Sequence, residues 1–478
     1  MALAGPETPA IEHPPLHGNR TPIGVPHAVV MMLLIIVATV ALTWVVPSGT
    51  FDRDSGGLVK PGTFHVVAKH YDTALLLGQP KSTATAAYPA SPLSALTAIP
   101  AGMTGAASLI FMIMFIGGMF GVLQETGALN AGIDRLVHVS RGNVYVIAPA
   151  LMLAIAAGST FLGLISEYLV LIPIMLVLSR RLGLDALFGT ALVTIAAKIG
   201  YLTSVTNPMA LAIAQPIVGV PVFSGIGFRL ATFVVFLPVG VWYLLRYARR
   251  TAAAPAEAEG PASTALPARH VVILGFVAAS VGMIVFGAQR LGWDNPELSA
   301  WYLFMAIGIA VVGRLGSRTA STAFLTGMKA MVLPALLVGL AKAVEVILRN
   351  GMILDTLINA MARLAEGHPP VIVAQAMMGI QMVIDVFIPS TSGKAAVTMP
   401  ILGPIGHLAG VSGQVCVQAF LFGNGLTNAV TPTSGMLLAY LATGNVSYGQ
   451  WLRFIAPLFL ILAALSLAAI SIAVVIGL

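Results

Sequence analysis

The fold of this chain follows from a helix-breaking phrase that occurs twice: GYLTSVTNP at residues 200–208 and GLTNAVTP at residues 425–432. Each copy interrupts apolar sequence and closes on a proline. An arginine, Arg229 or Arg453, follows that proline by 21 residues in both copies. Because unrelated segments would not keep the same spacing, the two phrases indicate a duplicated unit.

A second break precedes each phrase. It consists of GST at residues 158–160 in the first half and of PSTSG at residues 389–393 in the second. Breaks rich in Gly, Pro and small polar residues, at matching places in two hydrophobic halves, are typical of secondary transporters. In such proteins discontinuous helices form the substrate site near the middle of the membrane.

The composition of the chain is that of a membrane protein. Apolar residues make up 58% of the 478 residues and charged residues 9%, and the mean hydropathy is +0.94. An ordinary soluble domain is about 25% charged, so a soluble enzyme is excluded. Segments long enough to cross a bilayer, about 20 residues, lie at 26–46, 104–123, 185–202, 229–246, 270–288, 330–348 and 455–477, with a shorter one at 298–313.

The order of these segments predicts an all-α polytopic membrane protein built as an inverted repeat, with two re-entrant hairpins and two broken helices. Arg180 and Arg181 after the first hairpin indicate a cytoplasmic turn, whereas the loop after the second hairpin has no Lys or Arg, so the halves should face opposite ways. The expected parts are a cytoplasmic tail at 1–25, a first half at 26–247 with an external loop at 48–100 and a hairpin at 144–178, a cytoplasmic linker at 248–269, and a second half at 270–478 with a hairpin at 371–405.

Other classes of chemistry find little support in the sequence. The net charge of +7 lies in loops, where membrane orientation explains it, so we expect no nucleic-acid partner. Cys416 is the single cysteine, which excludes a disulfide within the chain. The HExxH, CxxC and Walker motifs are missing, so neither ATP-driven nor metal-dependent chemistry is favoured and no cofactor is expected.

The polar side chains at the breaks are the candidate binding groups. Backbone groups freed where a helix stops cost several kcal/mol each in lipid unless they meet protein, water or a ligand, and the amino ends of the half-helices favour an anion. An alternative is that small residues only let helices pack closely. We expect one cavity near the middle of the membrane, lined by Ser159, Thr160, Thr206, Asn207, Ser390, Thr391, Ser392, Asn424, Thr427, Asn428, Thr431 and Thr433.

Ionisable residues inside membrane segments are costly and usually functional. Glu167 follows the first hairpin tip and Lys394 the second, so these two are the leading charged candidates; Asp385 stands just before the second tip. We expect the Lys394 ammonium to pair with Glu167, with Asp385 or with a bound carboxylate. The alternatives are that Lys394 extends to the membrane surface, or that it forms a purely structural salt bridge with Glu167. Lys198, on the first broken helix, is a candidate for the same cavity.

Five stretches carry a resemblance to a known family: WVVPSGTF at 44–51, GLISE at 163–167, and the segments 207–215, 388–400 and 423–435. In these stretches, and over nearly its whole length, the chain resembles the C4-dicarboxylate anaerobic carrier and YfcC-like transporters, within a superfamily of elevator carriers. The resemblance implies a bacterial inner-membrane carrier of carboxylates or amino acids, with a scaffold and a moving domain that holds both hairpins. Some members are described as basic amino acid antiporters. A homodimer is also implied, since dimers are common in the superfamily.

Three positions depart from the pattern of that family. Ser166 stands where the family usually has the first of two adjacent Glu residues, Lys394 where it usually has Gln, and Asn424 where it usually has Asp. Together these changes make the site more positive, by roughly three charge units if every group takes its usual charge. They weaken the case for a basic amino acid and favour a negatively charged substrate, or a site in which Lys394 replaces a coupling cation.

The sequence therefore predicts a secondary carrier that moves a small anionic or zwitterionic carboxylate or amino acid by alternating access, with Na+ or H+ as the coupling ion. Basic amino acid antiport stays open as an alternative. So does a passive channel or a non-transporting receptor on the same scaffold.

Overall fold

The structure, a computed structural model, describes residues 28–53, 59–60, 62–71, 82–83, 85–139, 142–251, 267–363 and 367–478. The tail expected at 1–25 and most of the linker expected at 248–269 lie outside these residues. Seven of the described helices are long and apolar enough to cross a membrane, and a pair bent by 41° makes an eighth if it counts as one span. The prediction of a helical, multi-spanning membrane protein is confirmed.

The helices of the first half begin after the unplaced tail and end before the linker. They are α1 (Ala28–Val45), α2 (Pro92–Gly105), α3 (Ala107–Glu125), α4 (Ala128–Val139), α5 (Val144–Ala157), α6 (Leu171–Arg181), α7 (Ala186–Thr203), α8 (Pro208–Ile217) and α9 (Ile226–Thr251). Both α5 and α7 are followed by short irregular segments, as the two predicted breaks require.

The second half contains ten helices among the described residues. They are α10 (Ala268–Phe286), α11 (Asn295–Val312), α12 (Ser317–Ala330), α13 (Val332–Asn350), α14 (Leu354–Arg363), α15 (Pro370–Phe387), α16 (Thr391–Leu408), α17 (Gly413–Thr427), α18 (Gly435–Thr443) and α19 (Tyr448–Val475). The segment predicted as one span at 330–348 is part of the bent pair α12 and α13.

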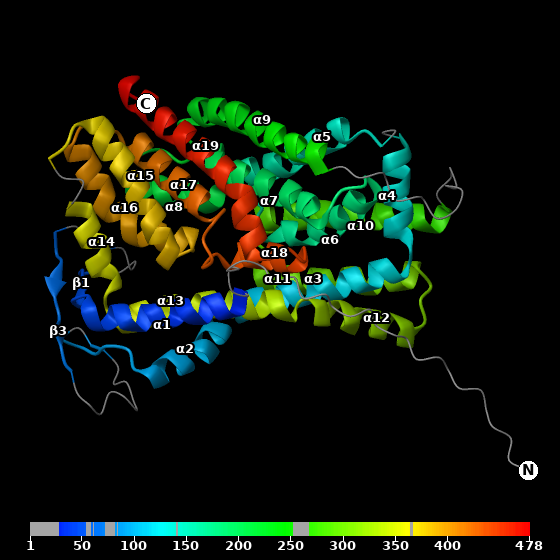
Figure 1. The fold of residues 1–478 in the computed structure, drawn as a ribbon, viewed down its shortest axis with the longest axis horizontal. Coiled ribbons are helices and arrows are strands. Elements are labelled where there is room, and N and C mark those ends of the chain that lie inside the picture. The colour runs from blue at the N-terminus through cyan, green and yellow to red at the C-terminus, as the bar shows by residue number, and fades with distance from the viewer. Residues whose placement is uncertain are drawn as a thin grey trace, which may run out of the picture.

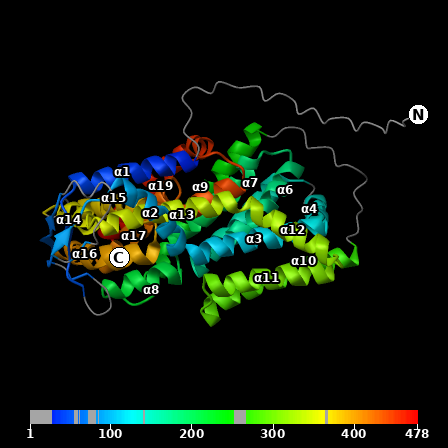
Figure 2. The ribbon, with the colours of Figure 1, turned by 90° about the horizontal axis from the view of Figure 1, so that it is seen from below.

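The helices form two groups (Figure 1). In the first, which we call the wall group, α1 and α2 pack on α13, and α11 and α12 pack on α3, with α10 beside α11 along the outer edge (Figure 2). In the second, the hairpin group, α5, α6 and α9 pack on α7, and α15, α16 and α19 pack on α17. Helix α8, which packs on α16, and helix α18, which contacts α6, α7 and α19, complete this group. The groups meet mainly where α13 packs on α18.

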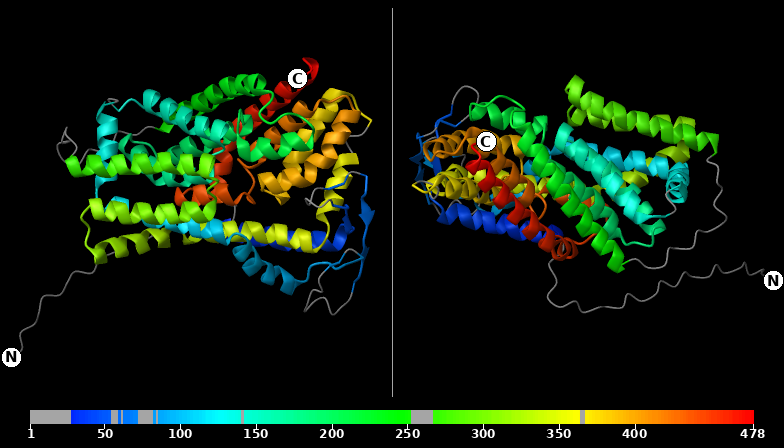
Figure 3. Two further views of the ribbon diagram at one scale, coloured as in Figure 1. Left: turned by 180° about the vertical axis from the view of Figure 1, so that it is seen from behind. Right: turned by 90° about the horizontal axis from the view of Figure 1, so that it is seen from above.

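Two short helices connect the groups at opposite ends of the molecule. Helix α4 contacts α3, α6 and α10, and α14 contacts α15 and α16. The first hairpin, α5 and α6, lies at the α4 end, whereas the second hairpin, α15 and α16, lies at the α14 end (Figures 1 and 3). The two hairpins therefore approach the centre of the molecule from opposite sides.

Glycine explains why α3 and α12 pack so closely in the wall group. A Cβ atom added at Gly117 would lie 2.6 Å from the carbonyl oxygen of Gly327, and one added at Gly121 would lie 2.1 Å from that of Ala323. No side chain fits at either position. Small residues that let backbones approach are a main source of helix association in membranes.

Before helix α2, which begins at Pro92, the described part of the external loop expected at 48–100 is a small β cap. Strand β1 (Gly49–Thr50) pairs antiparallel with β2 (His65–Val66), and β3 (Ala68–Lys69) pairs parallel with β4 (Ala86–Ala87). The cap is tied to the helices that it covers. Arg53 forms an ion pair of 3.1 Å with Asp355 of α14, and the Ser48 hydroxyl donates to the Gly351 carbonyl, after α13, at 2.8 Å.

Candidate functional site

The first hairpin breaks at 163–165 and not at the predicted 158–160. Helix α5 continues as a π-helical turn, Gly158–Leu162, and the chain leaves the helix at Gly163, whose φ is 76°. A Cβ atom added at Gly158 would lie 2.0 Å from the Tyr168 hydroxyl. Gly158 therefore serves close packing within the hairpin, while the left-handed residue that ends the helix comes five positions later.

The first broken helix is shaped by its caps. Helix α7 ends at Ser204, which has a left-handed φ of 39°. Helix α8 begins at Pro208, and the Asn207 side-chain oxygen accepts the Met209 N–H at 3.0 Å. A Cβ atom added at Gly163 would lie 2.5 Å from that same oxygen, so the two breaks of the first half touch.

Thr160 connects the first hairpin to the first broken helix. Its hydroxyl lies 2.9 Å from that of Thr203 and accepts the Val205 N–H at 3.0 Å. The hydroxyls of Ser159 and Thr206 donate to backbone carbonyls across the same contact, at 2.8 Å and 3.0 Å. These predicted residues are brought together, and the Thr160 hydroxyl satisfies a backbone N–H, that of Val205, within the break of the broken helix.

Serine side chains cap both helices that begin at the breaks of the second half. Ser390 accepts the Gly393 N–H at the start of α16 at 3.4 Å. Ser434 accepts the Leu437 N–H at the start of α18, also at 3.4 Å. Like α8, these helices start inside the molecule, where their amino ends add partial positive charge.

A buried ion pair lies beside the second hairpin break. The Lys394 ammonium lies 2.8 Å from Asp385 Oδ1, and both side chains are 0% exposed. It also lies 5.3 Å from the centre of the Phe420 ring. Asn428 donates to the other Asp385 oxygen at 2.8 Å. Lys394 thus takes Asp385, one of its three expected partners, and does not extend to the membrane surface.

Glu167 does not join this pair. Its carboxylate accepts the Ile165 N–H at 2.9 Å and the Ser166 hydroxyl at 3.3 Å, at the start of the short 3-10 helix Ser166–Val170. Among the described residues no cationic side chain forms an ion pair with it. The alternative of a structural salt bridge between Glu167 and Lys394 is therefore wrong, because local backbone groups hold the Glu167 carboxylate at its own break.

The two halves meet through a tyrosine that the sequence did not single out as a site residue. The Tyr201 hydroxyl, on α7, lies 2.6 Å from the Thr391 hydroxyl at the second hairpin break. Asn424 donates to the Tyr201 hydroxyl and, at 3.2 Å, to Thr391. The sequence feature that could have identified Tyr201 is its position in the repeated phrase at 200–208, where it is the one long side chain that ends in a polar group.

Three more predicted residues form hydrogen bonds elsewhere in the second half. Thr431 and Thr433 share a hydrogen bond of 2.8 Å, and Thr427 donates to the Met382 carbonyl at 3.2 Å. The side chain of Ser392 lies outside the described residues. Among the described residues, no group of three His, Cys, Asp or Glu side chains is placed to hold a metal ion.

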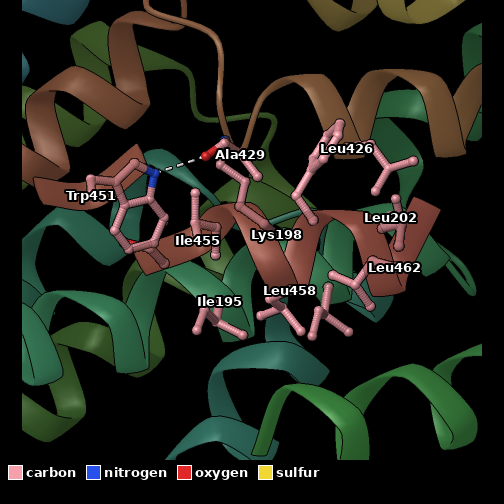
Figure 4. A pocket seen from close by; sticks show the side chains of 13 residues that line it. Ile195, Lys198, Leu202, Leu426, Ala429, Trp451, Ile455, Leu458 and Leu462 are labelled. Atoms are coloured by element: carbon pink, nitrogen blue, oxygen red, sulfur yellow. Dashed lines mark hydrogen bonds between the residues drawn. The ribbon is translucent and has the colours of Figure 1, made fainter. Parts of the chain in front are cut away.

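Lys198 lines a small pocket next to this network (Figure 4). Its side chain is 6% exposed and points into a cavity of about 20 Å³ between α7, α17 and α19. Apolar side chains form most of the wall. The Trp451 indole N–H is not free to bond a ligand there, because it donates to the Ala429 carbonyl at 2.9 Å.

Comparisons with known proteins agree on a carrier family. The family model described as "C4-dicarboxylate anaerobic carrier" (DcuC) matches residues 25–475. The chain is 30% identical to an Escherichia coli (strain K12) protein named "Putative basic amino acid antiporter YfcC", over 92% of this chain and 94% of that protein. It is 26% identical to an uncharacterized protein of Haemophilus influenzae, over 91% of this chain and 94% of that protein.

Two solved structures are also similar. The Alcanivorax borkumensis YdaH transporter has a TM-score of 0.45 and 17% identity, covering 95% of this chain and 99% of that one. Neisseria gonorrhoeae MtrF, described as one of a class of antimetabolite efflux pumps, has a TM-score of 0.40 and 18% identity, covering 95% and 96%.

Proposed function

Because this chain belongs to the C4-dicarboxylate anaerobic carrier family, it is a membrane transporter and not an enzyme, and we propose that it is a secondary active carrier of small anionic or zwitterionic carboxylates. The observation that carries this proposal is the buried pair of Lys394 and Asp385, next to the polar contact of Tyr201, Thr391 and Asn424. We also propose that the protein spans the bacterial inner membrane, with its amino terminus in the cytoplasm.

Charge favours an anionic substrate at this site. The Lys394 and Asp385 charges cancel, and the nearby Lys198 is a basic group without an ion-pair partner among the described residues. The amino ends of α8, α16 and α18 add partial positive charge. A carboxylate is therefore stabilised by the surroundings, whereas a second cation would be repelled.

Alternating access would use the arrangement of the two hairpins. They lie at opposite ends of the hairpin group, and that group contacts the wall group mainly through α18 and α13. We propose that the hairpin group moves as a body along the wall group, as in an elevator carrier. Inverted repeats allow two such states of similar energy, open to opposite sides.

Basic amino acid antiport is the second candidate, and Glu167 is the observation that favours it. Its carboxylate has no cationic partner among the described residues, and the E. coli relative is named for this activity. A cationic side chain bound at Glu167 would use the first hairpin instead of the second.

Counterflow in proteoliposomes tests the proposal. Vesicles containing the purified protein are loaded with unlabelled succinate, L-glutamate or L-arginine, and uptake of the same labelled compound is measured. We expect preloading with succinate or L-glutamate to accelerate uptake. Acceleration by L-arginine alone would instead support the antiporter, and no acceleration by any of the three would support a channel or a receptor.

Sodium dependence is measured in the same vesicles. If Lys394 takes the place of a coupling cation, uptake in choline buffer should match uptake in sodium buffer. A strict sodium requirement would contradict that role of the lysine.

A further inference from the structure

Lys198 is a buried lysine that lies outside the hydrogen-bonded contacts of the proposed carboxylate site. Its side chain is 6% exposed, and among the described residues it forms no hydrogen bond and no ion pair. The cavity into which it points has room for one water molecule. An ammonium group in such a place lacks most of the hydrogen bonds that it makes in water, and this costs several kcal/mol.

The walls of the cavity offer no compensation. Helices α7, α17 and α19 line it, and Lys198 is its one titratable lining residue. Thr194, the other polar residue of α7 in the wall, donates its hydroxyl to the Thr190 carbonyl at 2.7 Å. The Trp451 indole is likewise engaged (Figure 4). Among the described residues, neither side chain forms a hydrogen bond with the ammonium.

The charged and titratable groups nearby also bond to partners other than Lys198. The Asp385 carboxylate, on α15, is the charged group that acts on Lys198, yet its two oxygens are taken by Lys394 and Asn428. Tyr201, one turn further along α7, bonds to Thr391. The empty site is therefore neutral only if Lys198 carries no proton.

We propose that Lys198 carries the coupling proton of transport: it is neutral when the site is empty and protonated when a substrate carboxylate lies next to Lys394. This inference rests on the proposed function. The substrate carboxylate next to Lys394 adds one negative charge to the neutral pair of Lys394 and Asp385, and the proton on Lys198 balances the charge of that one carboxylate. The proton comes from water on the side to which the site is open, and it returns to water when the substrate leaves on the other side.

Proton uptake on binding tests this assignment directly. Succinate is added to the purified protein in weakly buffered, mildly alkaline detergent solution that contains a pH indicator. We expect wild type to take up about one proton for each succinate bound, and Lys198→Met to take up none. Lys342→Met is the matched control, because it removes another lysine from a membrane helix while Glu345 keeps its second partner, Arg349; it should behave as wild type.

Transport gives a second readout. With an inward proton gradient, wild-type vesicles should accumulate succinate several-fold above vesicles without a gradient. Lys198→Met should lose this accumulation. Lys198→Arg, which keeps the charge at all times, should also lose gradient-driven accumulation.

The outcomes separate the two proposals. No succinate counterflow in wild type would overturn the proposed function and this inference with it. Wild-type counterflow without any response to the proton gradient would overturn the role of Lys198 alone, and this test does not depend on any variant folding. Gradient-driven accumulation that persists in Lys198→Met would overturn it as well.

Discussion

Asp385 depends on its neighbours for charge balance, since one of its oxygens contacts Lys394 and the other accepts from Asn428. Removing one partner of a buried ion pair leaves an uncompensated charge, which costs about 3–5 kcal/mol. Removing both charges together is far less costly. Substitutions at this pair therefore separate the contribution to stability from the contribution to transport.

Lys394→Gln should lower the melting temperature in detergent, because Asp385 loses its cation. It should also introduce a sodium requirement for succinate uptake, since an external cation then fills the vacant place. The double variant Lys394→Gln/Asp385→Asn should regain much of the stability without regaining transport. Melting temperatures together with uptake in sodium and in choline check this; a single variant that matches wild type in both would contradict it.

Tyr201→Phe should reduce succinate affinity and uptake, because it removes the hydroxyl that joins the two halves and leaves the Asn424 donor short of an acceptor. The loss in stability should be about 1–3 kcal/mol. Tyr243→Phe is the control, since that hydroxyl donates to the Phe454 carbonyl away from the ion pair. Similar transport in both variants would argue against a role of Tyr201 in the site.

At the scale of residues, Lys394, Asp385 and Asn428 could be predicted as site residues from the sequence, because charges and amides inside apolar segments are rare. It left open which partner Lys394 takes. That choice depends on the rotation of α15 relative to α16, which spacing along the chain does not determine. Tyr201 and Asn424 bond across 223 positions, a separation at which local pattern carries no information.

The break in the first hairpin depends on two glycines with different roles. Gly158 allows close packing against Tyr168, and Gly163 ends the helix. Gly163→Ala should slow transport strongly, because a Cβ atom there would lie 2.5 Å from Asn207 Oδ1, in addition to the cost of a left-handed alanine, about 1–2 kcal/mol. Gly127→Ala is a matched control, since Gly127 has a φ of 70° and nothing within 4 Å of the added atom.

Succinate uptake and melting temperature distinguish the two glycine variants. Both variants should lose a similar amount of stability, because each places an alanine in the left-handed region. Only Gly163→Ala should lose transport. Equal transport in the two would mean that the contact between Gly163 and Asn207 has no part in the site.

At the scale of elements, the existence of both hairpins and both broken helices followed from Gly, Pro and polar residues in apolar sequence. The position of the first break was displaced, because the sequence alone does not reveal that Tyr168 packs over Gly158. The bend between α12 and α13 was missed. It lies at Met331, and the signal for it is Pro334, which has no N–H to donate to the Ala330 carbonyl four positions earlier.

The interface between the wall group and the hairpin group offers a direct test of movement. A Cβ atom added at Gly435 of α18 would lie 3.5 Å from that of Val338 in α13, a separation that suits a disulfide. In a Cys416→Ala background, Val338→Cys with Gly435→Cys should transport when reduced and stop when oxidised. Dithiothreitol should restore uptake.

A second pair lies within the hairpin group and serves as the control. A Cβ atom added at Gly403 of α16 would lie 3.7 Å from that of Val218, after α8. Gly403→Cys with Val218→Cys should form its disulfide without loss of uptake. Continued transport with the first pair fully crosslinked would show that the two groups do not move against each other along α13.

At the scale of the molecule, hydropathy predicted a helical protein with several segments long enough to cross a membrane. It did not predict which helices pack together. That arrangement rests on fits such as Gly117 against Gly327 and on contacts between residues hundreds of positions apart, which one sequence does not reveal.

The β cap is anchored through Arg53 to α14 and through Ser48 to the end of α13. If α13 stays fixed while the hairpin group travels, the cap stays fixed with it. An antibody fragment selected against the cap would then mark a stationary point on a small, nearly featureless particle. Such a marker would let electron microscopy align images of every state of the cycle, while the bound protein continues to transport.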